Sequence, residues 1–391
     1  MGFIALHLGV GTYNDNNNYD EYNELLNKAV ISAINILRKG GTAIVACTAA
    51  IKILEDDPLV NCGYGSNLTM DGTVECDASI MDGTNMHFGA CGAVSGVKNP
   101  IELAYKLCHN QSKESILVAP CILVGDGAYQ FAINEGLPLI EKEKLISAKA
   151  YKVYKKYKRY LNEYNNHIKK RQESEENSSE VVKPKIKVIV NTNKLSPVKN
   201  SKRKVEILDV ESSTKKMKDN EDDLENSDDL EIGKRYDTVG AVCIDNNGCL
   251  VSGVSSGGII LKQRGRIGQA CIFGAGIWSD ENVAVSTTGC GEHIIKTNLA
   301  KEIAGNVMDS EFNLVETLKL KYTDSPILKH EKMEKIAGAI VVNKTEKNCG
   351  IFSWGHTDRH MGVGYMSTDD DSPKICISSD YENIQSTTFL Y

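Results

Sequence analysis

The stretch Asp237-Thr238-Val239-Gly240-Ala241-Val242-Cys243-Ile244 separates two unlike parts of this chain. The tract before it, from Glu173 to Arg235, is rich in charge and contains no Phe, Trp or Tyr. The apolar residues after Gly240 predict a buried strand, which the turn Asp245-Asn246-Asn247-Gly248 ends. Thr238 is therefore expected where a loop open to cleavage becomes part of the core.

A cut between Asp237 and Thr238 would give the threonine a free α-amine beside its hydroxyl. Such an amine can act as the base for that hydroxyl, and threonine with an N-terminal amine is an established activated nucleophile. A threonine that opens a strand is ordinarily just a β-branched strand residue, so this dipeptide alone is weak evidence. The hypothesis depends on the motifs around it.

Composition limits the possible partners and cofactors. The 391 residues could form two domains, but the charged tract removes many of them from any core, so we expect one globular body with a long insertion. A net charge of -7 favours neither nucleic acid nor a membrane as partner. The twelve cysteines show no zinc spacing, so we expect no metal, no cofactor and a reducing compartment. Residues 1–10 lack a basic n-region and predict a strand rather than a signal peptide.

Apolar periodicity and turn residues divide the rest of the sequence into short helices and strands. Helices are predicted over residues 24–38, 100–108, 128–134 and 292–304, and from Thr42, as a cap, to Leu54. Strands are predicted at residues 74–80, 89–95, 122–124, 238–244, 250–255, 282–287, 337–343, 350–356 and 361–366. Strands cluster in each half of the chain with helices around them, which predicts an α+β layered sandwich.

The insertion has two parts. Residues 148–172, rich in Tyr and Lys, predict a long basic helix, which we expect to be solvated; a surface for acidic partners or nucleic acid is the alternative. The tract that follows has few large apolar residues, which predicts disorder. Its clusters Lys202-Arg203-Lys204 and Lys215-Lys216-Lys218 are spaced like a two-part nuclear import signal, although solvated charge alone would look much the same. We expect the protein in the nucleus, with the cytoplasm as a second location.

Two further segments carry polar groups toward the threonine. An antiparallel pair of strands would place Ser255 and Ser256 next to Thr238, and Thr288-Gly289 ends another strand where a helix begins. Two hydroxyls and the backbone of a turn could then surround one nucleophile, as hydrogen-bond partners and as donors to an oxyanion.

In combination, these motifs resemble the type 2 asparaginase family of N-terminal-nucleophile hydrolases, most closely its threonine aspartase (taspase) branch. The resemblance covers most of the chain outside the charged tract. It is carried by His7-x-Gly9-x-Gly11, Asn61-x-Gly63-x-Gly65-Ser66-Asn67, Glu75-Cys76-Asp77-Ala78-Ser79-Ile80-Met81-Asp82-Gly83, Asp237-Thr238-Val239-Gly240-Ala241-Val242, Ser255-Ser256-Gly257-Gly258, Gly265-Arg266-Ile267-Gly268 and Thr287-Thr288-Gly289-Cys290-Gly291-Glu292-His293. A chance match to all of them in this order is not credible.

The resemblance implies an αββα sandwich and self-cleavage between Asp237 and Thr238. It assigns Thr238 as the nucleophile, Ser256 as the hydroxyl that supports it, and Thr288 with Gly289 as the surroundings of the oxyanion. Residues 1–147 would form the body of the first subunit and 238–391 the body of the second. Residues 148–236 would form the basic helix and the charged loop that ends at the cut.

The resemblance also implies the substrate site. Arg266 would hold a substrate carboxylate through two parallel hydrogen bonds, with Gln269, Gly291 and Asn61 around the substrate. One position departs from the pattern: where small-substrate asparaginases carry Asp to hold the α-ammonium of a free amino acid, this chain has Gln269. A glutamine suits a neutral peptide amide better than a charged amine, because neither group then brings an unpaired charge. This favours a residue inside a polypeptide as substrate.

We therefore expect a threonine endopeptidase that matures by self-cleavage and then cuts proteins after Asp. The resemblance implies nuclear chromatin and transcription proteins as substrates, among them a trithorax-type histone methyltransferase and a general transcription factor, and a dimer of two-chain units. Two alternatives remain: an asparaginase or isoaspartyl peptidase acting on small molecules, and a nuclear scaffold that never cleaves. The tyrosines of residues 148–172 give the scaffold some appeal.

Overall fold

The computed structural model describes residues 2–11, 19–177, 235–236, 238–307, 312–345, 349–358, 360–379 and 385–390. The chain divides into two compact units, Met1–Tyr160 with Gly233–Tyr391, and Leu161–Ile232. Both sheets belong to the first unit. Asp237, the lysine clusters of the predicted import signal and almost all of the charged tract lie outside the described residues, so the predictions made for them stay predictions.

The larger sheet contains strands from both halves of the chain. Its order is β13-β12-β1-β6-β7-β2-β3-β4, with β5 also paired to β1. The strands are β1 (Phe3–Gly11), β2 (Cys76–Asp82), β3 (His87–Val94), β4 (Ile122–Val124), β5 (Arg235–Tyr236), β6 (Val239–Ile244), β7 (Leu250–Ser256), β12 (His360–Ser367) and β13 (Lys374–Ser378). The central pair β6 and β7 thus lies between β1 and β2, which precede the charged tract in the sequence.

The smaller sheet has the order β14-β11-β10-β9-β8 and packs on the larger one. Its strands are β8 (Ile277–Ser279), β9 (Val283–Gly289), β10 (Ala337–Thr345), β11 (Cys349–His356) and β14 (Gln385–Leu390). Phe3 of β1 stacks on Phe389 of β14, with ring centroids 3.9 Å apart, and also contacts Phe352 of β11. The aromatic layer between the sheets is therefore built from both ends of the chain.

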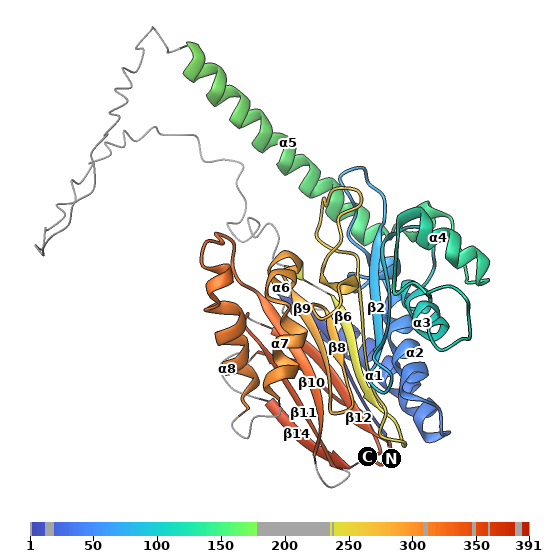
Figure 1. The fold of residues 1–391 in the computed structure, drawn as a ribbon. Coiled ribbons are helices and arrows are strands. Elements are labelled where there is room, and N and C mark those ends of the chain that lie inside the picture. Colours follow the sequence, from blue (N-terminus) through green and yellow to red (C-terminus); the bar gives the residue numbers. More distant parts are fainter. Residues whose placement is uncertain are drawn as a thin grey trace, which may run out of the picture. The chain divides into compact units, whose positions relative to one another are not determined.

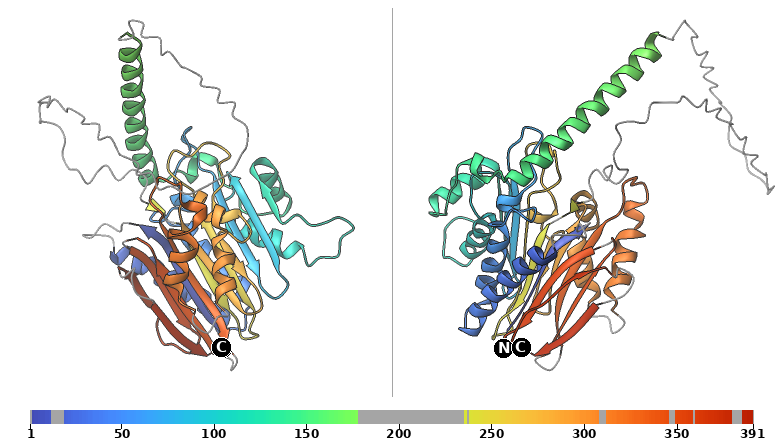
Figure 2. Two further views of the ribbon diagram at one scale, coloured as in Figure 1. Left: turned by 60° about the vertical axis from the view of Figure 1, so that its left-hand side comes forward. Right: turned by 180° about the vertical axis from the view of Figure 1, so that it is seen from behind.

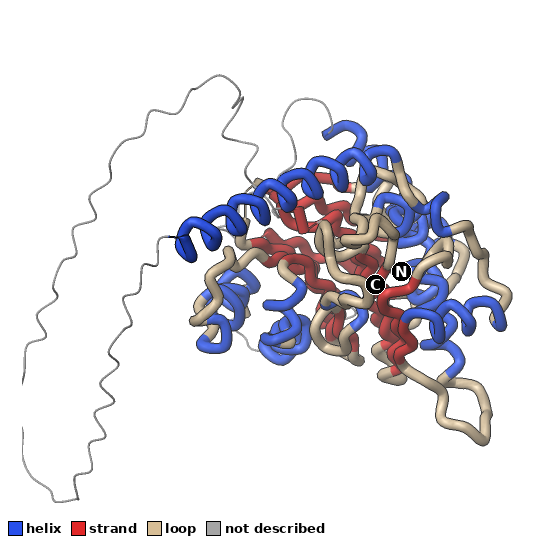
Figure 3. The backbone as a smooth tube through the Cα atoms, turned by 90° about the horizontal axis from the view of Figure 1, so that it is seen from above, coloured by secondary structure: helices blue, strands red, loops and turns tan. Residues whose placement is uncertain are grey.

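Helices cover the outer face of each sheet, as Figures 1 and 2 show. The larger sheet carries α1 (Tyr19–Arg38), α2 (Ala43–Glu55), α3 (Pro100–Asn110) and α4 (Gly125–Asn134), and the smaller sheet carries α6 (Gly291–Thr297), α7 (Leu299–Asn306) and α8 (Leu314–Leu318). Shorter helical turns lie at Gly63–Gly65, Lys142–Leu145, Gln269–Cys271, Lys319–Thr323 and Pro326–Leu328. Figure 3 shows both sheets between the helices, which confirms the predicted αββα sandwich.

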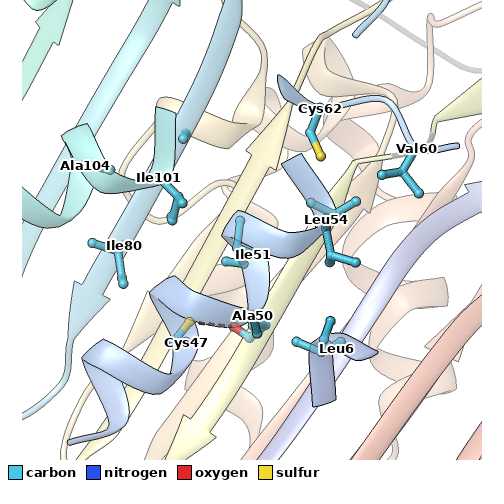
Figure 4. Close-up of a cluster of buried hydrophobic side chains, with 14 of the residues drawn as sticks. Leu6, Cys47, Ala50, Ile51, Leu54, Val60, Cys62, Ile80, Ile101 and Ala104 are labelled. Atoms are coloured by element: carbon cyan, nitrogen blue, oxygen red, sulfur yellow. Dashed lines mark hydrogen bonds between the residues drawn. The ribbon is translucent and has the colours of Figure 1, made fainter. Parts of the chain in front are cut away.

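Helix α2 shows why the sequence forms this layer. Its apolar residues Cys47, Ile51 and Leu54 recur at three- and four-residue spacing, so they share one face, and all are fully buried against β6 and β7. Figure 4 shows this face meeting Leu6 of β1 and Ile80 of β2. Each buried Leu or Ile side chain contributes roughly 1.5–3 kcal/mol to the stability of the fold. The helix thereby holds in place the strand that begins at the expected nucleophile.

Two local predictions were wrong. Thr42 precedes α2 but its side chain makes no capping bond; Asp245 Oδ2 accepts from the N–H of Ala43 instead (3.0 Å). The helix predicted over residues 292–304 is two helices, because Asn298 adopts a left-handed conformation at φ 48°. Asparagine tolerates that conformation, and carbonyls of Gly274 and Ala275 accept from the first turn of α7. In the first case a residue distant in sequence replaces the local cap, and in the second, distant carbonyls accept from the helix that begins after the break.

The predicted basic helix is present as α5 (Ala148–Asn177). In its first half, Tyr154 Oη and Lys158 Nζ both donate to the carbonyl of Met70, at 3.3 and 2.7 Å. Lys149 Nζ donates to the carbonyl of Leu59 (3.0 Å). The beginning of α5 is therefore attached to the loop that follows α2, rather than solvated on all sides.

Candidate active site

Thr238 lies immediately before β6, and the pairing of β6 with β7 brings it opposite Ser256. Its Oγ1 donates to Ser256 Oγ at 3.1 Å, and Ser256 Oγ also accepts from the N–H of Gly258 at 3.0 Å. Both hydroxyl side chains are almost fully buried. The register of one hairpin thus produces the hydroxyl pair that the sequence predicts.

A second polar group contacts the threonine hydroxyl. Gln269, on the turn Gln269–Cys271, donates from Nε2 to Thr238 Oγ1 at 3.2 Å and is 3% exposed. A Cβ atom added to Gly291 would lie 2.7 Å from Gln269 Oε1, so only glycine leaves the amide this position. Gln269 therefore touches the hydroxyl directly as well as lining the space beside it.

These groups surround a small hollow. Its lining residues are Asn61, Thr238, Ser256, Gly258, Ile259, Arg266, Gln269, Gly289 and Gly291. The predicted site residues are all among them, except Thr288 and the undescribed Asp237. Thr288 is fully buried behind Gly289, whose φ of 137° favours glycine. None of the quoted motifs includes Ile259.

Asn61 shapes the wall of this hollow through a loop distant in sequence. Its Nδ2 donates to the carbonyl of Gly258 (2.8 Å), and its backbone carbonyl accepts from the N–H of Gly257 (2.7 Å). Asn67 adds a second bond to the carbonyl of Gly258 (2.9 Å). The Asn61 motif therefore fixes the turn that follows Ser256.

Arg266 supplies positive charge to the hollow. Its Nε and Nη2 donate to Glu292 Oε1 and Oε2 at 2.9 and 2.8 Å, a fork between two side chains that are 14% and 47% exposed. Burial raises the pKa of the Glu292 carboxyl, but the hydrogen bonds and charge of Arg266 outweigh it and hold that pKa below its ordinary value. The sequence motifs contained Glu292 without revealing this pairing.

Asp77 of β2 fixes the loop that carries Arg266 and Gln269. It is fully buried, and its Oδ1 and Oδ2 accept from the N–H groups of Ala93 and Gly268, both at 2.8 Å. Burial raises the pKa of this carboxyl, although these bonds and Lys262 favour the charged form. Loss of Asp77 would leave the substrate loop without its anchor.

His7 of β1 lies opposite Gly240 of β6, on the strand next to that of the nucleophile. Its Nε2 lies 3.0 Å from Ser286 Oγ, and Ser286 Oγ donates to the carbonyl of Gly253 (3.2 Å). A Cβ atom added to Gly240 would clash with both side chains, which explains the glycine two residues after Thr238. Burial lowers the pKa of His7 to about 3, so the imidazole is neutral at physiological pH.

Glu55, at the end of α2, is expected to make the stability of the fold depend on pH. It is fully buried, and its Oε1 accepts from Ser255 Oγ (2.7 Å) and from the N–H of Ile101 (3.0 Å). Burial raises its pKa from 4.5 to about 8, so the folded protein retains a proton that the unfolded chain has lost between these pH values.

We expect the free energy of unfolding to fall as pH rises from 5 to 8, by up to about 1.4 kcal/mol for each pH unit. Replacing Glu55 with Gln removes this carboxyl and should flatten the slope. Urea denaturation of both proteins across the range measures it. Identical slopes would contradict the assignment.

Among the described residues, no group of three or more His, Cys, Asp or Glu side chains is arranged to hold a metal ion. None of the described helices combines the length and the apolar character needed to cross a bilayer. All twelve cysteines are free thiols.

Comparison with known proteins adds independent evidence. A family model described as Asparaginase matches residues 2–376. An isoaspartyl peptidase/L-asparaginase of Rattus norvegicus is 32% identical over 320 residues, covering 81% of this chain and 73% of the rat protein. A probable isoaspartyl peptidase/L-asparaginase 2 of Arabidopsis thaliana is 31% identical over 357 residues, covering 90% and 93%. A plant-type L-asparaginase of Pyrococcus horikoshii is 30% identical over 380 residues, covering 96% and 99%.

Proposed function

Because this chain belongs to the type 2 asparaginase family and is therefore an N-terminal-nucleophile hydrolase, we propose that it is a threonine endopeptidase of the threonine aspartase (taspase) kind. It would cleave itself between Asp237 and Thr238 and then cut other proteins after Asp. The observation that carries this proposal is Gln269, a neutral amide in contact with the hydroxyl of Thr238.

The hollow lacks a group for a free α-ammonium. Among the residues that the structure describes, the nine that line it include one cation, Arg266, and no carboxylate. Free asparagine would bring an ammonium into this space, and an unpaired charge is costly to remove from water. A residue within a polypeptide has a neutral N–H instead, and the side-chain oxygen of Gln269 can accept a hydrogen bond from it.

A second hollow supports a longer substrate. Its volume is about 410 Å³, and its lining includes Arg264 and Gly265, the two residues before Arg266, together with Tyr129 and Lys142. Residues that flank the substrate Asp could occupy it, whereas a single amino acid would not need the space.

The proposed reaction occurs twice at the same hydroxyl. In maturation, Thr238 Oγ1 attacks the carbonyl carbon of Asp237, the C–N bond breaks, and the proton of the hydroxyl passes to the departing nitrogen, which becomes the α-amine of Thr238. Water then hydrolyses the ester and releases the Asp237 carboxylate. A free α-amine has a reference pKa of about 7.7 to 8.0, which suits a base near neutral pH.

In the second reaction the α-amine takes the proton of the hydroxyl as Oγ1 attacks the carbonyl after a substrate Asp. The departing peptide amine takes up that proton, and water hydrolyses the second ester. In this proposal Ser256 orients the nucleophile, as its 3.1 Å contact permits, and Arg266 holds the Asp side chain. Gly289 and Thr288 lie on the oxyanion side, where backbone donors stabilise developing charge.

An asparaginase or isoaspartyl peptidase is the second candidate. The names of the relatives favour it, since these are isoaspartyl peptidases and L-asparaginases at 30–32% identity. In that function Arg266 would hold the α-carboxylate of a small substrate. The two candidates differ in what lies beside Gln269: a peptide amide or a free ammonium.

The deciding assay gives the mature protein three substrates: a peptide with an internal Asp, free asparagine and a β-aspartyl dipeptide. We expect the internal peptide to be cleaved with the highest kcat/KM. Gln269→Asp should lower that value at least tenfold, because a carboxylate beside a peptide amide has no partner charge. Gln263→Asp, the same change at an exposed position of the same loop, is the matched control. Faster turnover of either small molecule by the unaltered protein would establish the second candidate.

The cellular part of the proposal concerns location and assembly. Nuclear chromatin and transcription proteins are the proposed substrates, and a dimer of two-chain units is the proposed assembly. The lysine clusters 202–204 and 215–218 remain the proposed import signal. The same assay distinguishes an inactive scaffold from both enzymatic candidates, because a scaffold would turn over none of the three substrates.

A further inference from the structure

The fork between Arg266 and Glu292 leaves one end of the guanidinium unused. Among the described residues, the side-chain hydrogen bonds of Arg266 are the two to Glu292, which use Nε and Nη2. A guanidinium carries five N–H groups, so both on Nη1 and one on Nη2 are left. These three form the end of the fork, opposite the edge that Glu292 holds.

That end is surrounded by glycines. A Cβ atom added to Gly258 or Gly268 would lie 2.9 Å from Nη1, and one added to Gly291 would lie 2.8 Å from Nη2. Gly258 and Gly291 line the same hollow as Thr238. The free end of the guanidinium is therefore accessible only because these positions carry no side chain. It can donate two parallel hydrogen bonds to a second carboxylate.

Glu292 is the group that determines which end is free. Its two oxygens match Nε and Nη2 at 2.9 and 2.8 Å, so the guanidinium cannot rotate its Nε edge toward the hollow while the pair is intact. Its negative charge also opposes a second carboxylate on the same cation. Glu292 also lies in the first turn of α6, where a negative charge stabilises a helix. That role alone would not require both of its carboxylate oxygens to contact Arg266.

We propose that Glu292 is a specificity-determining positioning residue: it directs the Nη1 end of Arg266 at the substrate carboxylate and limits how tightly that carboxylate is held. This inference rests on the proposed function for the identity of the carboxylate, an Asp side chain. Glu292 acts through Arg266 and does not contact the reacting atoms.

Two substitutions separate its two effects. Glu292→Gln keeps a carbonyl oxygen that can accept from the guanidinium but removes the charge, so a product peptide that ends in Asp should bind at least threefold more tightly. Glu292→Ala removes the contact altogether, so the guanidinium loses its orientation and the preference for Asp over Asn should fall about tenfold. The two variants at this one position should therefore shift the preference for Asp over Asn in opposite directions, upward for Gln and downward for Ala.

The measurement uses the mature enzyme and two product peptides that differ only in ending in Asp or Asn. Their inhibition constants give the preference without relying on turnover, and kcat and KM for the matching internal peptides are measured alongside. The control is Glu302→Ala, because Glu302 is 46% exposed and pairs with Lys321 at 3.1 Å, against 47% exposed for Glu292. It should leave the preference unchanged.

Shifts in the same direction from both variants, or shifts no larger than that of the control, would overturn the proposal. If Glu292→Ala fails to fold, the tighter binding expected of Glu292→Gln still decides. A failure of the proposed function is recognised separately, because the unaltered protein would then turn over only small molecules. In that case asparagine and 3-aminopropanamide, which lacks the α-carboxylate, replace the peptide pair, and the same opposite shifts are expected.

Discussion

Thr238→Ala is expected to remain a single chain and to cleave no peptide. The substitution removes the Oγ1 that contacts both Ser256 and Gln269, and no other hydroxyl among the described residues shares those two contacts. Losing a catalytic nucleophile costs on the order of a millionfold in kcat in a well-studied hydrolase. Denaturing gels of the purified protein over time, with N-terminal sequencing of any new fragment, measure the first effect. A fluorogenic peptide with an internal Asp measures the second.

Thr238→Ser is the matched variant, since it keeps a hydroxyl and loses only a methyl group. It should still mature and should retain measurable peptide cleavage. Appearance of a fragment that begins at residue 238 in the Ala variant would show that another protease makes the cut. Self-cleavage would then be excluded, whatever the mature protein does.

Arg266→Ala should lower kcat/KM for peptides with an internal Asp by about a hundredfold. A hydrogen bond to a charged group contributes about 1.5–3 kcal/mol, and each 1.36 kcal/mol is a factor of ten in rate. Lys should recover little of this loss, because an ammonium cannot form the planar two-bond grip of a guanidinium. The assay compares the three proteins on peptides with Asp and with Asn at the cut position.

The fold should survive this substitution, because Arg266 contacts Glu292 at the surface and lies outside the apolar core. Thermal unfolding of the Ala variant should therefore stay close to that of the unaltered protein. Equal turnover of Asp and Asn peptides by the unaltered enzyme would remove the basis for assigning Arg266 to the substrate carboxylate.

The sequence predicted the parts of the site that depend on short-range pattern. The strand after Thr238, the hairpin that returns at Ser256 and the amphipathic helix α2 all follow from apolar periodicity and turn residues, and the structure contains each of them. The roles within the site came from the family resemblance. The layered sandwich also follows from the grouping of strands and helices along the chain.

The contacts that the sequence did not reveal all join distant segments. Asp245 accepts a hydrogen bond from the first turn of α2, 202 residues away in the sequence, and Asp77 accepts one from Gly268, 191 residues away. Glu292, in α6, pairs with Arg266. Asp77 and Glu292 lie within the quoted motifs and Asp245 within a predicted turn, but neither a motif nor a turn shows which distant group a carboxylate will contact. Strands β8, β13 and β14 were not predicted.

If the chain is cut before Thr238, the strand order affects whether the protein can refold. If the cut is made at Thr238, β6 and β7 belong to one piece while β1 and β2, which flank them, belong to the other. The two pieces would stay together through the ladders on both sides, so the native protein should not dissociate on dilution. Once unfolded, however, they would have to find each other by diffusion, and refolding would become dependent on concentration. The folded lifetime of the cut form would then depend on how slowly it unfolds, and not on an equilibrium between folded and unfolded protein.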